Sequence, residues 1–192
     1  MMRDFFEAVR FLTILPVPRR GKEASLARSM FFFPLVGFLI GILTLTITEA
    51  LSLDVFVRLE ALALVTLPIL LSGGLHIDGF ADFCDGFFGG KGKEEVLRIM
   101  RDSRIGVWGA LGVALLLFWK WELLASFPGR GQALLLSVTA SRWAQVVLAY
   151  FLPYANPSQG LGEAVAKKVK VRELVGATAF LAIVVFFMKG SG

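Results

Sequence analysis

Three aspartates at helical spacing are the residues of this chain that most clearly could do chemistry. Asp78, Asp82 and Asp85 stand at i, i+4 and i+7, which places their carboxylates on one stripe of a helix. Like charges this close repel one another, and the apolar segment before them desolvates them further, so a cation among them is favoured. Hard oxygen ligands suit Mg²⁺, or else Mn²⁺ or Ca²⁺. The sequence therefore predicts a metal site formed by these three residues.

A solvated acidic helix face is the plain alternative. The carboxylates follow residues 61–77, which contain no Lys, Arg, Asp or Glu, and acidic groups at the edge of a bilayer are functional candidates. We therefore favour the metal site. The chain has one Cys and one His, so a Cys- or His-cluster metal site is excluded. Cys84 lies off the acidic stripe and is expected to pack against neighbouring side chains.

Basic residues follow the acidic stripe within the same segment. Arg98, Arg101 and Arg104 recur every three residues, and a metal beside guanidinium groups suits a substrate whose phosphates bridge the two. Asp102 lies among them and is open to three roles: metal ligand, base, or ion-pair partner that positions Arg98. The chemistry indicated is transfer at a phosphorylated substrate.

Further candidates lie within or beside apolar stretches. Arg142 stands in the middle of one, where an unpaired charge is expensive, so it is expected to face an acid or a polar cavity and is a candidate phosphate ligand. His76 is a second candidate for phosphate binding, although a hydrogen-bonded structural role is favoured. Lys120 and Glu122 are expected to pair with each other.

The composition shows which elements must position these residues. Of 192 residues, 56% are hydrophobic and 18% charged, against about 45–50% and about 25% in soluble domains. We expect an all-α, polytopic membrane bundle, residues 1–192 forming one domain, with residues 74–104 forming one or two helices at the membrane face. About 20 apolar residues span a bilayer core. The expected spans are 29–48, 55–73, 105–127, 132–152 and 173–188.

Lys and Arg alternate between the links that join these spans. Residues 1–28 hold six, 49–54 none, 74–104 five, 128–131 one, 153–172 four and the tail one. This alternation predicts a cytoplasmic N-terminus and a cytoplasmic acidic segment in an inner membrane. The charges do not form one face, so binding of nucleic acid is not expected. A homo-oligomer is compatible with the sequence.

Several segments together resemble a known family, the cobalamin synthases (adenosylcobinamide-GDP ribazoletransferases). The resemblance rests on GGLHIDGFADFCDG at 73–86, RIMRDSRIGVWGALG at 98–112, FLTILPVP at 11–18, FFFPLVGFLIG at 31–41, Ser141-Arg142, and GLGEAV at 160–165. It implies a membrane enzyme that joins α-ribazole, or its 5′-phosphate, to adenosylcobinamide-GDP and releases GMP in a reaction that requires Mg²⁺.

The resemblance and the residue chemistry together suggest roles for the site residues. The three aspartates would hold Mg²⁺ against the diphosphate, Arg101 and Arg104 would share the negative charge, and Asp78 or Asp102 would accept the proton of the attacking hydroxyl. Two alternatives remain. Residues 82–86 also resemble the first half of the motif of CDP-alcohol phosphotransferases, although its second acidic pair is absent. A cation transporter would instead need acids on more than one span.

Overall fold

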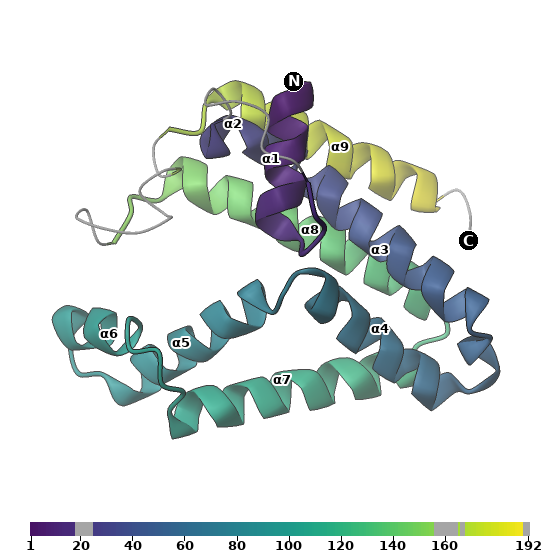
Figure 1. Cartoon of the computed structure of the whole chain (residues 1–192), viewed down its shortest axis with the longest axis horizontal. Helices are drawn as coiled ribbons and strands as arrows, with labels where there is room; N and C mark the ends of the chain where they lie inside the picture. The colour runs from purple at the N-terminus through teal and green to yellow at the C-terminus, as the bar shows by residue number, and fades with distance from the viewer. Residues whose placement is uncertain (18–24, 156–164, 166–167, 190–192) are drawn as a thin grey trace.

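The computed structural model describes residues 1–17, 25–155, 165 and 168–189, and within them the chain is helical and contains no strand (Figure 1). The predicted all-α class is thus confirmed. The helices are α1 (Met2–Leu12), α2 (Leu26–Ser29), η1 (Met30–Phe32), α3 (Phe33–Ala50), η2 (Leu53–Val55), α4 (Val57–Leu71), α5 (Leu75–Gly89), α6 (Lys93–Ile99), α7 (Val107–Ser126), α8 (Arg130–Phe151) and α9 (Val171–Lys189).

Four of the five predicted spans coincide with helices that are long and apolar enough to cross a membrane. These are Leu26–Ala50, which joins α2, η1 and α3, followed by α7, α8 and α9. Side chains such as Phe118, Trp119, Phe186 and Phe187 are more than half exposed on them, and a bilayer covers such surfaces. The chain is therefore a polytopic membrane protein.

The second predicted span, 55–73, is not one straight helix. α4 has 15 residues, about 22 Å at 1.5 Å per residue, and the chain then bends by 92° into α5. Gly73 and Gly74 adopt φ of 62° and 74° at the bend, a conformation that Gly adopts easily and that ends helices. The Ile14 N–H donates to the Leu71 carbonyl at 2.9 Å, which satisfies one carbonyl at the end of α4.

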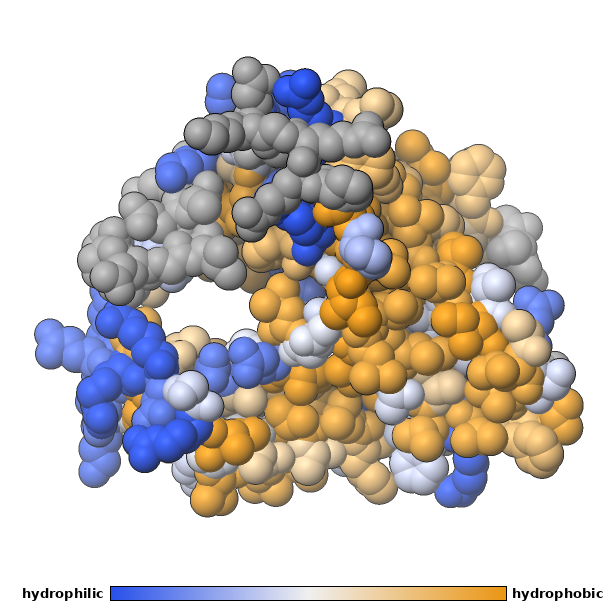
Figure 2. All heavy atoms as spheres, viewed as in Figure 1, coloured by the Kyte–Doolittle hydropathy of each residue, from blue (hydrophilic) through white to orange (hydrophobic). Residues whose placement is uncertain are grey.

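The helices pack in two groups that α4 connects. α3 lies along α8, with α9 and α1 against them, while α5 packs on α7 and carries α6 at its far end. α4 contacts both α3 and α7. Figure 1 shows the two groups as separate layers, and Figure 2 shows hydrophilic residues gathered at the α6 end beside a largely hydrophobic body. The acidic helix thus belongs to an arm that lies outside the main bundle.

An ion pair ties the two groups together at the end opposite α6. Arg130 at the start of α8 donates to Glu60 of α4 at 2.5 Å, and both side chains are at least four-fifths buried. Nearby, the Trp121 indole N–H of α7 donates to the Arg58 carbonyl at 3.0 Å. These contacts link α4 to both α7 and α8.

Two glycines on α3 set how closely it approaches α8. A Cβ added at Gly37 would lie 2.7 Å from the Val138 carbonyl oxygen, and one at Gly41 would lie 2.7 Å from Leu135 Cδ1. Small residues four positions apart allow membrane helices to approach this closely. The main bundle therefore depends on the absence of side chains along this line.

We predict that Gly37→Ala lowers the stability of the protein by about 1–3 kcal/mol, because the new methyl group meets backbone that cannot move aside. Gly131→Ala is the matched control, since its Cβ would meet only the flexible end of the Leu45 side chain, with Cδ2 at 3.3 Å, and should change stability by less than about 1 kcal/mol. Thermal unfolding of the two purified variants in detergent measures this. Equal midpoints would contradict close α3–α8 packing.

Candidate active site

Asp85 joins α5 to the start of α7. Its side chain is buried, one carboxylate oxygen accepts the Gly106 N–H and the other accepts the Gly109 N–H, both at 2.7 Å. The first N–H groups of a helix lack partners within the helix and carry partial positive charge. Asp85 therefore caps α7 from a neighbouring helix, as a carboxylate does at an ordinary N-cap.

Glycines on α7 make room for this carboxylate. A Cβ at Gly106 or at Gly109 would overlap the Asp85 carboxyl group, and one at Gly112 would lie 2.6 Å from Cys84 Sγ. Cys84 is buried in this contact, which confirms the prediction that it packs. The glycine stripe of RIGVWGALG thus fits the face of α5 that carries Cys84 and Asp85.

Asp78 and Asp82 have no such partner. Asp78 is exposed and Asp82 half-buried, and no hydrogen bond or ion pair links either side chain to the rest of the described chain. Asp82 lies within electrostatic reach of both Asp78 and Asp85, as the predicted stripe requires. The structure thus separates the three residues by role: one is engaged by α7, and two remain available.

The metal site predicted from the sequence used all three carboxylates. Among the described residues, no three His, Cys, Asp or Glu side chains are grouped as metal ligands. Mg²⁺ on phosphorylated substrates commonly takes only one or two carboxylates, the phosphates and water filling the other positions. Asp78 and Asp82, one helical turn apart with oxygen donors unpaired, fit that requirement. A ligand role for Asp85 stays a prediction.

Asp102 pairs with Arg104 and not with Arg98, which corrects one of the three alternatives. Arg104 donates from its guanidinium group at 2.7 Å and from its backbone N–H at 3.1 Å. These hydrogen bonds lower the pKa of Asp102 to about 2. A carboxylate with so low a pKa is a weak proton acceptor, so the base role suits Asp102 poorly.

The three arginines of this segment differ in their surroundings. Arg98, in the last turn of α6, lies 3.7 Å from Glu95, and Arg104 is held by Asp102. Arg101, exposed in the turn after α6, forms no ion pair with any described residue. Arg101 is therefore the guanidinium group most available to a ligand at this end.

Arg142 is buried in α8 without an acidic partner in the described part of the chain. It is 7% exposed, its guanidinium group donates to Ser141 Oγ at 3.0 Å, and its Nε has no hydrogen-bond partner. Its aliphatic stem packs where α3 has Gly37. Arg142 was expected to face either an acid or a polar cavity, and the described residues do not provide the acid.

His76 lies near two positive charges. Its Nε2 is buried and has no hydrogen-bond partner among the described residues, so the expected hydrogen-bonded structural role is not confirmed at this atom. Arg142 and Lys120 both act on it electrostatically. Lys120 forms no ion pair among the described residues, and Glu122 instead accepts a hydrogen bond from Ser126 at 3.4 Å, so the predicted Lys120–Glu122 pair is wrong.

The sequence did not predict that Lys120 lies within electrostatic reach of His76 and Arg142. The signal in the sequence is a lysine inside a largely apolar helix, but Glu122 two residues later suggests a local pair. Some of the predicted features cannot be placed. Arg19, Arg20, Lys22, Lys167 and most of GLGEAV (160–164) lie outside the described residues.

Comparisons with known proteins extend the resemblance over nearly the whole chain. The family model for cobalamin-5-phosphate synthase matches residues 4–192. Relatives named adenosylcobinamide-GDP ribazoletransferase are 37% identical in Chlorobium phaeobacteroides (98% of this chain, 77% of the relative), 35% in Escherichia coli (90% and 73%) and 37% in Syntrophobacter fumaroxidans (98% and 79%).

No solved structure matches the chain. The chain spans about three quarters of the length of these relatives. The matches favour neither a CDP-alcohol phosphotransferase nor a cation transporter. From the family match and from the relatives, this chain belongs to the cobalamin-5-phosphate synthase family.

Proposed function

We propose that this protein transfers α-ribazole, or α-ribazole 5′-phosphate, to adenosylcobinamide-GDP, forming adenosylcobalamin or its phosphate and releasing GMP, with Mg²⁺ as cofactor. The observation that carries the proposal is the family match over residues 4–192. The site supports it, because two unpaired carboxylates on α5 lie in the same short segment as a basic turn. Such a combination suits a diphosphate substrate.

Asp78 and Asp82 are the residues that would hold Mg²⁺. When bound, the ion would neutralise negative charge on the diphosphate and on the GMP leaving group. Asp85 would support this pair indirectly. By accepting the N–H groups of α7, it fixes the orientation of α5 and therefore the position of Asp78 and Asp82.

The reaction forms a bond between a ribose hydroxyl oxygen of α-ribazole and the phosphorus attached to cobinamide; this is not the 5′-oxygen, which is already esterified in α-ribazole 5′-phosphate. The bond from that phosphorus to the oxygen of GMP breaks, and the hydroxyl proton needs an acceptor. Asp78 is the better acceptor of the two candidates, because Asp102 is tied to Arg104; in this role one Asp78 oxygen would bind Mg²⁺ and the other would accept the proton. Arg101, with Arg98 and Arg104 beside it, would share the negative charge that develops during transfer.

Arg142 and His76 would contact phosphate oxygens at a deeper position. Each has a buried nitrogen without a hydrogen-bond partner among the described residues. The oxygen atoms of a phosphate would form hydrogen bonds with these nitrogens, which apolar side chains cannot do. Lys120 adds positive charge to the same place.

We also propose that the end carrying α6 and the start of α9 faces the cytoplasm. The alternation of Lys and Arg between the spans supports this orientation, and the hydrophilic α6 end in Figure 2 agrees with it. A phosphorylated corrinoid substrate would then reach Asp78 and Asp82 from the cytoplasmic side.

The test of the function is GMP release by purified protein in detergent. Adenosylcobinamide-GDP, α-ribazole and Mg²⁺ should give GMP, and omission of α-ribazole or addition of EDTA should abolish it. CDP-diacylglycerol with an alcohol is the control donor pair and should give no CMP. Absence of GMP from folded, substrate-binding protein would contradict the proposal.

We predict that Asp82→Asn and Asp85→Asn fail for different reasons. Asp82→Asn should keep the unfolding temperature and lower kcat by about 100-fold or more, because charge stabilisation is lost. Asp85→Asn should lower stability by about 1–3 kcal/mol, because its amide group cannot accept both N–H groups of α7. Activity and thermal unfolding of both variants measure this, and identical behaviour would contradict the division of roles.

We predict that Arg142→Met leaves the unfolding temperature of the unliganded protein unchanged or raises it, because a buried cation without an acid is costly. Affinity for adenosylcobinamide-GDP should fall at least about tenfold, since charge-assisted hydrogen bonds are lost. Arg58→Met, in the first turn of α4 where the side chain lies over the Trp121 ring, is the control. A large fall in unfolding temperature with normal affinity would show that Arg142 is only structural.

We predict that Asp102 does not produce the acidic limb of the pH–rate profile. Its pKa in the folded protein lies below that of a free aspartate, so its pair with Arg104 is present above pH 4 and is lost only as pH falls through about 2. Asp102→Asn should therefore leave any inflection between pH 5 and pH 8 in place. Loss of that inflection would assign the base to Asp102.

A further inference from the structure

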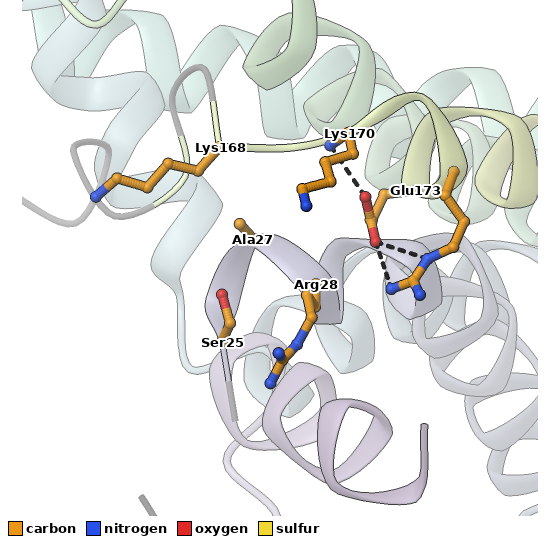
Figure 3. Close-up of a pocket in the computed structure, with 7 residues that line it drawn as sticks. Ser25, Ala27, Arg28, Lys168, Lys170 and Glu173 are labelled. Carbon is orange, nitrogen blue, oxygen red and sulfur yellow. Dashed lines mark hydrogen bonds and ion pairs between the residues drawn. The ribbon is translucent and has the colours of Figure 1, made fainter. Parts of the chain in front are cut away.

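A second polar site lies at the start of α9, away from the acidic helix. Here α2 and the chain entering α9 enclose a cavity of about 350 Å³ whose lining includes four cationic side chains and one carboxylate, shown in Figure 3. The cations are those of Arg28, Lys168, Lys170 and Arg172. The function proposed above uses none of them.

The single carboxylate of the cavity, Glu173, is occupied by structural contacts. It is 1% exposed and accepts the Lys170 backbone N–H at 3.0 Å, the position of an N3 acid that caps its own helix. It also accepts two bonds from Arg172, at 3.0 and 2.7 Å. Glu173 therefore accepts from the start of α9 and from Arg172, and it forms no ion pair with either lysine side chain.

The other arginine of the cavity, Arg28, is also paired with a carboxylate. Arg28 lies 3.3 Å from Asp4 of α1. Lys168 and Lys170 are exposed, and neither side chain forms an ion pair within the described ranges. Figure 3 shows Lys170 projecting into the space between α9 and Arg28. The cavity thus combines two paired guanidinium groups with two ammonium groups that pair with no carboxylate among the described residues.

The cavity lies where a membrane-spanning helix begins. Val171 and Val175, in the first turns of α9, are 58% and 59% exposed, and α9 is apolar enough to span a bilayer. The apolar surface of α9 thus starts beside the cavity, which is the level of lipid headgroups. Cationic pockets at this level bind anionic headgroups.

We propose that this cavity binds a phosphate group that carries net negative charge. Lys168 and Lys170 supply the attraction, and the guanidinium groups of Arg28 and Arg172 supply further donors. The headgroup of an anionic phospholipid and a soluble phosphate ester share this chemistry. The site is independent of the transferase reaction proposed above.

The test compares two double variants with the same spacing and the same loss of charge. Lys168→Gln/Lys170→Gln removes the lysines of the cavity, and Lys91→Gln/Lys93→Gln removes two exposed lysines near α6. The probes are dioctanoyl phosphatidylglycerol, dioctanoyl phosphatidylcholine and glycerol 3-phosphate. Affinities are measured by native mass spectrometry of the full chain in detergent, after thermal unfolding has shown that both variants are folded.

We expect phosphatidylglycerol to bind the wild-type chain more tightly than phosphatidylcholine does. The 168/170 variant should lose about thirtyfold in affinity, because each of the two lysines contributes about fivefold. The 91/93 variant should bind as the wild type does. Loss confined to phosphatidylglycerol identifies a lipid site, and an equal loss for glycerol 3-phosphate identifies a site for soluble phosphate. Equal effects of both double variants, or no effect on either probe, would overturn the proposal.

Discussion

The contact between Asp85 and the first N–H groups of α7 is the interaction on which the candidate site depends. The first N–H groups of a helix have no partner within the helix, and here a carboxylate from α5 accepts two of them. The contact fixes how α5 lies along α7, and so determines where Asp78 and Asp82 point. Gly106 and Gly109 are part of the same constraint, since any side chain there would displace the carboxylate.

The break between α4 and α5 gives this contact its position. A straight continuation of α4 would carry α5 away from the path it takes, whereas the 92° bend lays α5 against α7. The bend uses two glycines with positive φ, and the Ile14 N–H occupies one of the carbonyls that the end of α4 leaves. The N-terminal segment thus helps to fix the bend that orients the acidic helix, although it contributes no candidate ligand.

Hydropathy and charge were sufficient to predict four spans and the helical state of the acidic segment, because each depends on local composition. The bend was not predictable, since two glycines in an apolar segment do not specify a direction. The partner of Asp85 lies 21 and 24 residues further along the chain, and all three aspartates show the same helical spacing. Spacing alone therefore could not separate the residue that holds α7 from the two that remain available.

Some arginines of the chain are paired with carboxylates and others are not. This difference says more about function than the number of basic residues does. Arg104, Arg130 and Arg172 each have a carboxylate within 2.7 Å, so their charge is already used by the fold. Arg142 is buried, its Nε has no hydrogen-bond partner in the described part of the chain, and a membrane protein gains no stability from such a group. We propose that an anionic substrate supplies the missing partner of this group, because its binding would satisfy the Nε donor.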